Sequence, residues 1–217
     1  MQNTPTGLSV LDVPTPPSLP GPPAWVHYTV ESPWLLVVLL LLGAAVAVSV
    51  FQHRGMAGRG LKVGVPLVVL AAALGVAAHF VVTDREAIAA STRRLVGAVA
   101  TADSAALEEE LGEPCTLYYF QAPDGLGRAG ILTAVTAAFS QGSAYAVSDW
   151  KLEALQTRAT GERTGQAQVK VFVVPAQWNL PHHSWWRIDY VKDGDGRWRA
   201  GAVAPLAIQG VENARGR

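Results

Sequence analysis

The chain is short of cysteine and of charge. Of its 217 residues only Cys115 is a cysteine, which excludes an internal disulfide, and no second cysteine or spaced histidine stands near it to complete a zinc site. Charged residues make up 16% of the chain, against about 25% in an ordinary soluble domain. The 17 basic and 17 acidic side chains cancel, so the composition gives no sign of nucleic-acid binding. We therefore expect no metal, no cofactor and no nucleic-acid partner.

Two uninterrupted apolar runs account for the missing charge. They cover residues 34–51 and 63–82, and neither contains a charged side chain. Each is as long as the roughly 18 to 20 apolar residues that a bilayer core requires. A buried helix of a soluble protein normally keeps one polar face, which neither run has. The sequence therefore predicts two transmembrane helices and a chain embedded in the lipid bilayer.

The basic residues between the runs predict the orientation. Residues 52–62 carry Arg54, Arg59 and Lys62 without an acidic residue, and no Lys or Arg precedes Arg54. A cleavable signal peptide needs a basic start, so the first run reads as a retained span. The positive-inside rule places the loop 52–62 in the cytoplasm. The leader 1–33 and everything after the second span are then expected outside the cytoplasm, in a multi-pass protein of the cell (inner) membrane.

The two flanks of the spans differ in kind. Eight of the 14 prolines fall within residues 1–33, a composition typical of an extended, disordered leader. From residue 84 the apolar periodicity is first helical and then alternating, which predicts one α+β domain at 84–206 and a flexible tail at 207–217. The expected helices are 84–102, 104–111 and 130–140, and the expected strands are 147–158, 166–175, 184–193 and 197–205, the last two joined by a turn at 193–196.

Two stretches of this domain carry a resemblance to a known family. The opening DREAIAASTRRLVGAVATADSAALEEEL is helical with a break at Ala102-Asp103, and the close WWRIDYVKDGDGRWRAGAVAP is an aromatic hairpin with an Asp/Gly turn. Together they resemble the nuclear-transport-factor-2-like superfamily, which includes ketosteroid isomerase and the polyketide cyclases. The resemblance implies a cone-shaped domain of three helices packed on a curved antiparallel sheet. It also implies that an enzyme of this kind would work inside the cone, with a carboxylate base or a His-Asp pair.

Alternation along the strands predicts which side chains face the interior. Trp186, Ile188 and Tyr190 share the inward face of their strand, and Val169 lies in the inward row of the strand before it. Asp149 and Glu153 of the first strand point outward. This leaves the predicted interior without a carboxylate, so we expect no catalytic residue. The side chains expected to line a ligand pocket are aromatic: Tyr118, Tyr119, Trp150, Trp186, Tyr190 and Trp198.

The opposite face of the sheet is apolar enough to predict an interface. It is expected to hold Phe172, Val174, Trp185, Val191 and Val203. A monomer seldom exposes an apolar patch larger than about a few hundred Å2, and larger patches mark contacts. We expect a second copy of the chain or a partner protein to bind there, unless the helical hairpin, the segment from Ile208 or the membrane surface covers this face.

Three further polar features read as structural. His182 and His183 are expected in a loop at the rim of the cone, because adjacent side chains in an extended chain point apart and no third metal ligand is in view. Asp193 and Asp195 are expected to be turn residues, since the other ligands of a calcium loop are missing. Cys115 reads as a small buried hydrophobe, because Glu113 is the only side chain near it in the sequence that could act as a base to activate the thiol.

These features favour a membrane-anchored, extracytoplasmic, non-catalytic binding or assembly module. Two alternatives stay open: a membrane-tethered isomerase, dehydratase or cyclase-like enzyme, and an assembly scaffold of the type found in type IV secretion. An inward carboxylate within hydrogen-bond distance of a Tyr or His, in a closed pocket, would favour the enzyme. A filled interior would favour binding through the outer surface.

Overall fold

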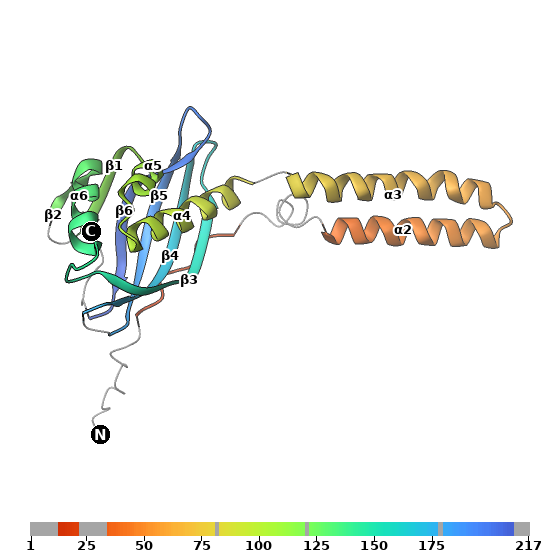
Figure 1. The fold of residues 1–217 in the computed structure, drawn as a ribbon. Helices are drawn as coiled ribbons and strands as arrows, with labels where there is room; N and C mark the ends of the chain where they lie inside the picture. The colour runs from red at the N-terminus through yellow and green to blue at the C-terminus, as the bar shows by residue number, and fades with distance from the viewer. Residues whose placement is uncertain (1–12, 22–33, 81–82, 120–121, 178–179, 211–217) are drawn as a thin grey trace, which may run out of the picture. The chain divides into compact units, whose positions relative to one another are not determined.

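The computed structural model describes residues 13–21, 34–80, 83–119, 122–177 and 180–210 (Figure 1). The chain forms two compact units, which are described separately. One unit is Gly21–Thr83, and the other joins Asp84–Arg217 to Met1–Pro20. Most of the predicted leader and of the predicted tail lies outside the described residues.

The first unit is a hairpin of two apolar helices. Helix α2 spans Trp34–His53 and α3 spans Ala57–Phe80, and Gly55 takes a positive φ of 71° in the turn between them. Both helices are long and apolar enough to cross a membrane. Helix α3 begins inside the stretch expected to be the loop 52–62, because lysine and arginine are good helix formers and need not end a helix.

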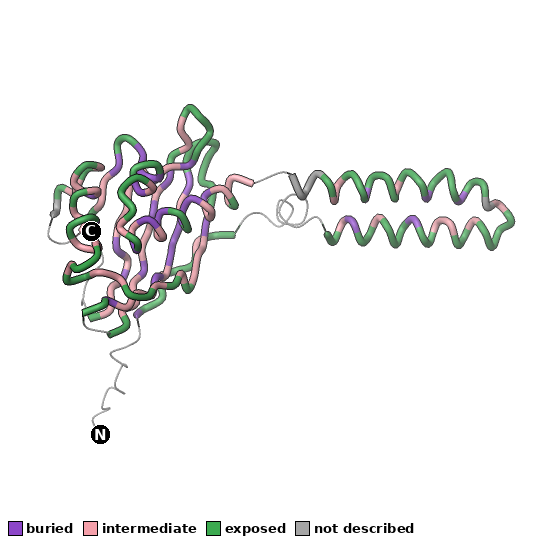
Figure 2. Tube along the Cα trace, in the orientation of Figure 1, coloured by how far each residue is buried: buried purple, intermediate pink, exposed green. Residues whose placement is uncertain are grey.

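Small residues bring the two helices of the hairpin close together. A Cβ atom added at Gly64 would lie 2.7 Å from Val48 Cγ2, and one added at Gly60 would lie 3.0 Å from Phe51 Cβ. Ala71 on α3 is 1% exposed. Glycine and alanine permit such backbone approach, which is how apolar helices pack without a hydrophobic driving force. Most of the large apolar residues of the two helices are exposed (Figure 2).

The second unit is an α+β domain built on a mixed sheet. Its strands lie in the order β2-β1-β6-β5-β4-β3, and all neighbours are antiparallel except β1 and β6, which are parallel. The strands are β1 Leu111–Tyr119, β2 Ala122–Gly127, β3 Val147–Ala159, β4 Thr164–Pro175, β5 His182–Lys192 and β6 Trp198–Ile208. The expectation of a fully antiparallel sheet is therefore wrong at the pair β1–β6.

Strands β1 and β2 have no counterpart among the strands expected from the sequence. In β1 the run Gly112-Glu113-Pro114 interrupts the alternation of apolar and polar residues. In β2 Gly125 takes a positive φ of 79°, which an alternating pattern does not reveal. Strand β6 also runs on to Ile208, past the residue 206 at which the domain was expected to end.

The helices of the domain lie close to their expected positions. They are α4 Asp84–Ala100, α5 Ser104–Glu110 and α6 Arg128–Phe139. The expected break between α4 and α5 is present, because Ala102 has a positive φ of 53° and the Asp103 carboxylate accepts a hydrogen bond from the Ala106 amide at 3.0 Å. Asp103 is therefore the N-cap of α5.

One apolar core joins the three helices to one face of the sheet (Figure 1). Ile188 and Tyr190 of β5 are 2% and 1% exposed, and Val169 of β4 is 1% exposed. All three were expected to face inward, so the strand phase read from the sequence is confirmed for these residues of β4 and β5. The buried members of this core are Ile88, Leu95, Ala98, Leu107, Leu111, Cys115, Ile131, Val135, Ala167, Val169, Val171, Ile188, Tyr190, Trp198 and Ala200.

Candidate functional site

The six aromatic residues expected to line a pocket are not brought together. Tyr190 and Trp198 are buried within the core, and Trp186 packs against it. Trp150 of β3 lies next to α4, where a Cβ atom added at Gly97 would be 3.6 Å from its ring. These four side chains are part of the packing between the helices and the sheet.

The two remaining aromatic residues lie on β1, toward the other edge of the sheet. Tyr118 is 45% exposed, so it does not line the interior. Tyr119 pairs with Ala122 of the edge strand β2. Sequence analysis grouped these two tyrosines with the other aromatic residues because it predicted no strand at residues 111–119.

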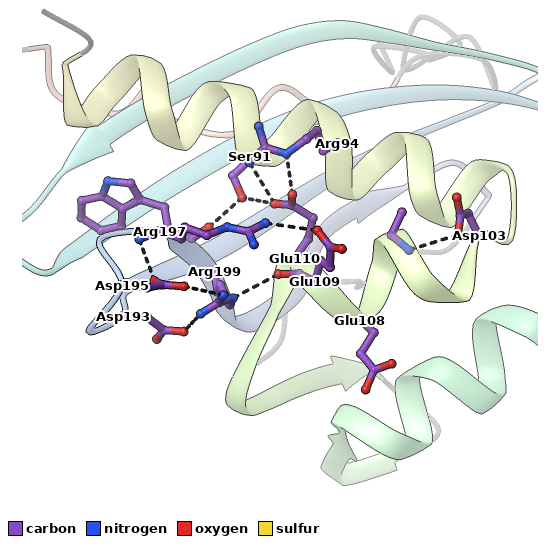
Figure 3. Close-up of polar contacts among 12 residues, drawn as sticks. Ser91, Arg94, Asp103, Glu108, Glu109, Glu110, Asp193, Asp195, Arg197 and Arg199 are labelled. Carbon is purple, nitrogen blue, oxygen red and sulfur yellow. Dashed lines mark hydrogen bonds and ion pairs between the residues drawn. The ribbon is translucent and has the colours of Figure 1, made fainter.

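A carboxylate lies inside the domain, where none was expected. Glu110, the last residue of α5, is 3% exposed, and its two oxygens face α4 (Figure 3). Arg94 Nε donates to Glu110 Oε1 at 2.5 Å, and Ser91 Oγ lies 2.5 Å from Glu110 Oε2 and 2.9 Å from the Trp198 carbonyl oxygen. The expectation of an interior free of carboxylates is therefore wrong, because alternation along strands says nothing about side chains that come from helices.

The Tyr190 hydroxyl is buried near this cluster without a hydrogen-bond partner among the described residues. Burial raises the pKa of Tyr190 far above its ordinary value of 10.0. The Thr92 hydroxyl donates to the Ile88 carbonyl oxygen at 2.8 Å and the Ser91 hydroxyl faces the two acceptors named above, so neither hydroxyl hydrogen is directed at Tyr190. Tyr190 thus stays a neutral phenol inside the core.

The arrangement of Glu110 is that of a structural ion pair. Both carboxylate oxygens are engaged, one by the Arg94 guanidinium and the other by the Ser91 hydroxyl. Arg94 itself remains 56% exposed, so the pair spans from solvent into the core. A general base must lie within reach of a substrate proton, and this carboxylate is 3% exposed and packed between Arg94 and Ser91.

A second group of charges closes the β5–β6 hairpin against α5 (Figure 3). Arg199 contacts the carboxylates of Asp193 and Asp195 and donates to the Glu109 carbonyl oxygen at 3.1 Å. Asp195 also accepts from the Arg197 amide at 2.9 Å, a bond that lowers the pKa of its carboxyl. Asp193 and Asp195 are thus confirmed as turn residues.

The cysteine and the histidine pair also have structural surroundings. Cys115 is 2% exposed, which confirms it as a buried core residue, and burial raises the pKa of its thiol to about 11. His182 and His183 open β5 rather than lie in a loop, and His183 Nδ1 is 3.1 Å from Glu153 Oε2. Within the described ranges, no group of three or more His, Cys, Asp or Glu side chains is placed to hold a metal ion.

The outer face of the sheet is covered in part by the N-terminal segment. Residues 13–20, here called the strap, lie behind the sheet, on the side away from α4 (Figure 1). Val13 and Trp185 are 4% and 3% exposed and form a small second core with Ala207. At the other end of the strap the Leu19 amide donates to Gln156 Oε1 at 2.8 Å. The cover on this face includes the chain's own leader, which sequence analysis did not consider.

The expected interface residues are divided between the two faces. The Phe172 and His183 rings are tilted against each other with their centroids 5.2 Å apart, and Val191 is 46% exposed. Val174 is half-buried on the face that also carries Phe172. Val203, however, pairs with Ile188 and packs against the main core, so its placement on the outer face is wrong. The cause is an irregularity between Asp189 and Tyr190, which shifts the alternation of β6 by one residue.

No protein family model matches the chain, and no curated protein matches it by sequence. An NTF2-like protein from Cytophaga hutchinsonii has a similar structure over 58% of this chain and 100% of its own, with 16% identity and a TM-score of 0.48. A candidate ketosteroid isomerase from Shewanella frigidimarina matches over 54% and 92%, with 13% identity and a TM-score of 0.44. The association domain of C. elegans CaMKII matches over 54% and 91%, with 14% identity and a TM-score of 0.46. Likeness at this level carries no argument about activity, substrate or partner.

Proposed function

We propose that the chain is a membrane-anchored binding or assembly module of the NTF2-like superfamily, with its α+β domain outside the cytoplasm. In this proposal the hairpin of α2 and α3 holds the domain at the bilayer. The domain itself binds a partner through its surface and does not transform a substrate in its interior.

The non-catalytic part of the proposed function rests on the close packing of the domain's interior. Ile88, Leu107 and Tyr190 are each 1% exposed or less, so large side chains occupy the space in which a substrate would have to sit. The one interior carboxylate described above, Glu110, is held by Arg94 and Ser91. An enzyme of the isomerase kind needs both an open pocket and a free base.

The surface of the hairpin supports membrane anchoring. Trp34, Leu42 and Val69 are 66%, 57% and 61% exposed on helices that carry no polar face. In water such a surface would be a large exposed apolar patch, whereas in lipid it needs no other cover. The association of the strap with the domain is consistent with two spans, because an even number of crossings returns the chain to the side on which it began.

Thiol labelling in intact cells tests the orientation. In a Cys115→Ala background, Gly58→Cys near the turn of the hairpin is expected to be shielded from an impermeant maleimide. Gly194→Cys in the β5–β6 turn is expected to be labelled. Both glycines are exposed, and an added Cβ at either meets nothing within 4 Å, so the two variants are matched. The opposite labelling pattern would overturn the orientation, and extraction of the chain by alkaline carbonate would overturn the anchoring.

A further inference from the structure

A groove runs along one face of the helical hairpin, between α2 and α3. Its volume is about 580 Å³, and its lining comes from residues 41–52 of α2 and 61–69 of α3. The lining residues recur every three or four positions, so each helix contributes one of its faces. Ala44, Ala45 and Gly64 keep the groove hollow, because none of them has a side chain larger than a methyl group.

The groove is as long as one leaflet of a bilayer is thick. Residues 41–52 rise by about 16 Å along α2. Half of the roughly 30 Å hydrocarbon core of a bilayer is about 15 Å. One end of the groove adjoins the turn at Gly55, and the other end lies near the middle of α2. An acyl chain of the leaflet at the turn therefore matches the groove in length and in polarity.

The end of the groove at the turn is basic. Arg59 and Lys62 precede the lining residue Val65 at steps of three, so helical spacing continues this line of α3 toward the turn. Arg54 lies in the turn itself, and all three cations are exposed. Residues 32–83 contain no Asp or Glu, so the hairpin supplies no counter-ion. Because Cα–Cβ bonds lean toward the start of a helix, the cations of α3 lean toward the membrane surface.

Two polar side chains line the groove at the same end. Gln52 lies in the last turn of α2, and Ser49 lies about 4.5 Å deeper along the helix. Neither side chain makes a hydrogen bond to another residue that the structure describes. A hydroxyl or amide at membrane depth is costly without a partner. The ester oxygens of a phospholipid lie just below its phosphate and accept such hydrogen bonds.

We propose that this groove holds one anionic phospholipid, with an acyl chain between α2 and α3 and its phosphate against Arg59 and Lys62. Arginine and lysine both bind phosphate, and a lipid without a cation of its own leaves them uncontested. Anionic lipids are concentrated in the cytoplasmic leaflet, where the turn lies in the proposed orientation. This inference rests on the proposed function, since the groove must lie within a bilayer.

Lipid retention by the full chain tests the proposal. The chain is reconstituted into vesicles of phosphatidylcholine with a minority of phosphatidylglycerol, recovered by flotation, and extracted in mild detergent. Native mass spectrometry then counts the lipids and the copies of the chain in each particle. Both leaflets of these vesicles have the same composition, so the result does not depend on the orientation of the chain.

Three variants separate the charge from the shape of the groove. Arg59→Gln with Lys62→Gln removes the contacts to the phosphate. Ala45→Phe fills the groove and leaves every charge in place. Val46→Phe is the matched control, because it adds the same ring at a neighbouring position that is 61% exposed and outside the groove. A far-UV circular dichroism spectrum of each purified chain verifies that the helices are retained.

The unmodified chain and Val46→Phe should each retain about one phosphatidylglycerol, and the other two variants should retain at least about five-fold less. No preference for phosphatidylglycerol over phosphatidylcholine would overturn the proposal. So would retention in the Ala45→Phe variant, which would reduce the site to attraction by surface charge, and so would equal loss in Val46→Phe. A dimer that Ala45→Phe dissociates would assign the groove to a second hairpin instead.

The flotation step separates this inference from the proposed function. A chain that does not float with the vesicles would contradict the membrane anchor, and the lipid site with it. A chain that floats but retains no phosphatidylglycerol would contradict the lipid site alone.

Discussion

The hairpin and the α+β domain treat their apolar side chains in opposite ways. In the hairpin Leu42 is 57% exposed and the small residue Ala71 is buried, whereas in the domain Ile88 is fully buried. The domain therefore hides its large side chains from water by itself. The hairpin buries small residues in the contact between its helices and leaves the large ones exposed, as the proposed bilayer anchor requires. The contrast teaches that apolar side chains form a self-contained core in one region, whereas in the other they remain exposed and, under the proposed function, need a bilayer to cover them.

Truncation of a buried tryptophan gives the largest expected effect. Trp198 is 4% exposed in the main core, and its indole nitrogen donates to Asp84 Oδ1 at 3.2 Å. Trp198→Ala should lower the free energy of unfolding of the domain by about 3 to 5 kcal/mol, through lost burial and a cavity. Urea unfolding of the full chain in detergent, followed by circular dichroism, measures it. The matched control, Trp34→Ala at a 66% exposed position of α2, should leave the domain's transition unchanged. Equal losses of unfolding free energy in the two variants would contradict the difference between the two regions.

A large residue at the helix contact tests the hairpin in the same way. Gly64→Leu should force α2 and α3 apart, because even a Cβ atom there would lie 2.7 Å from Val48 Cγ2. Overpacking of this kind costs about 1 to 3 kcal/mol. The expected result is a slower electrophoretic mobility in dodecyl sulfate with no change in the domain's urea midpoint. Gly75→Leu, where an added Cβ meets nothing within 4 Å, is the control and should migrate like the unmodified chain.

The interior ion pair offers a smaller test within the domain. Glu110→Gln removes the charge that Arg94 pairs with and should destabilise the domain by about 1 to 3 kcal/mol. Glu109→Gln changes a 69% exposed neighbour and should stay within about 0.5 kcal/mol of the unmodified chain. The same urea experiment compares the two variants. A Glu110→Gln variant as stable as the Glu109→Gln variant would mean that the Arg94–Glu110 pair contributes nothing to the fold.

The smallest effect concerns acid stability on the outer face. The hydrogen bond from Lys170, together with His183, lowers the pKa of Glu153 below its ordinary value of 4.5. A carboxyl whose pKa is lower in the folded state stabilises the fold above pH 4.5, and this contribution is lost as pH falls through the folded-state pKa. Because the group is close to solvent, the loss should remain below about 1 kcal/mol. The difference between the urea midpoints at pH 7 and pH 3 should therefore be slightly smaller for Glu153→Gln than for the unmodified chain. A larger difference in the variant would contradict the lowered pKa of Glu153.

Apolar periodicity predicted those parts of the fold in which one adjacent layer of structure determines whether a side chain is buried. Helix α4 and the inward set of Ile188, Tyr190 and Val169 follow directly from apolar spacing. The length and composition of the two apolar runs likewise located α2 and α3. Such features are local, so the sequence carries them without knowledge of the rest of the chain.

The features that sequence reasoning missed depend on contacts between distant elements. Glu110 is one of three consecutive glutamates, and only the packing of α5 on α4 decides which of them is buried. Val203 changes face because of an irregularity in the β5–β6 pairing. The strap could have been considered from its valine and leucine among prolines, but its seat is formed by β3, β4 and β5 together.

The central claim is that lipid covers the hairpin and not the domain. A fluorophore on Leu42→Cys and one on Val191→Cys, each in a Cys115→Ala background, compare two apolar positions that are 57% and 46% exposed. In bilayers that contain brominated lipids, the account predicts strong quenching at position 42 and none at position 191. Quenching at neither position, or at position 191 alone, would contradict it.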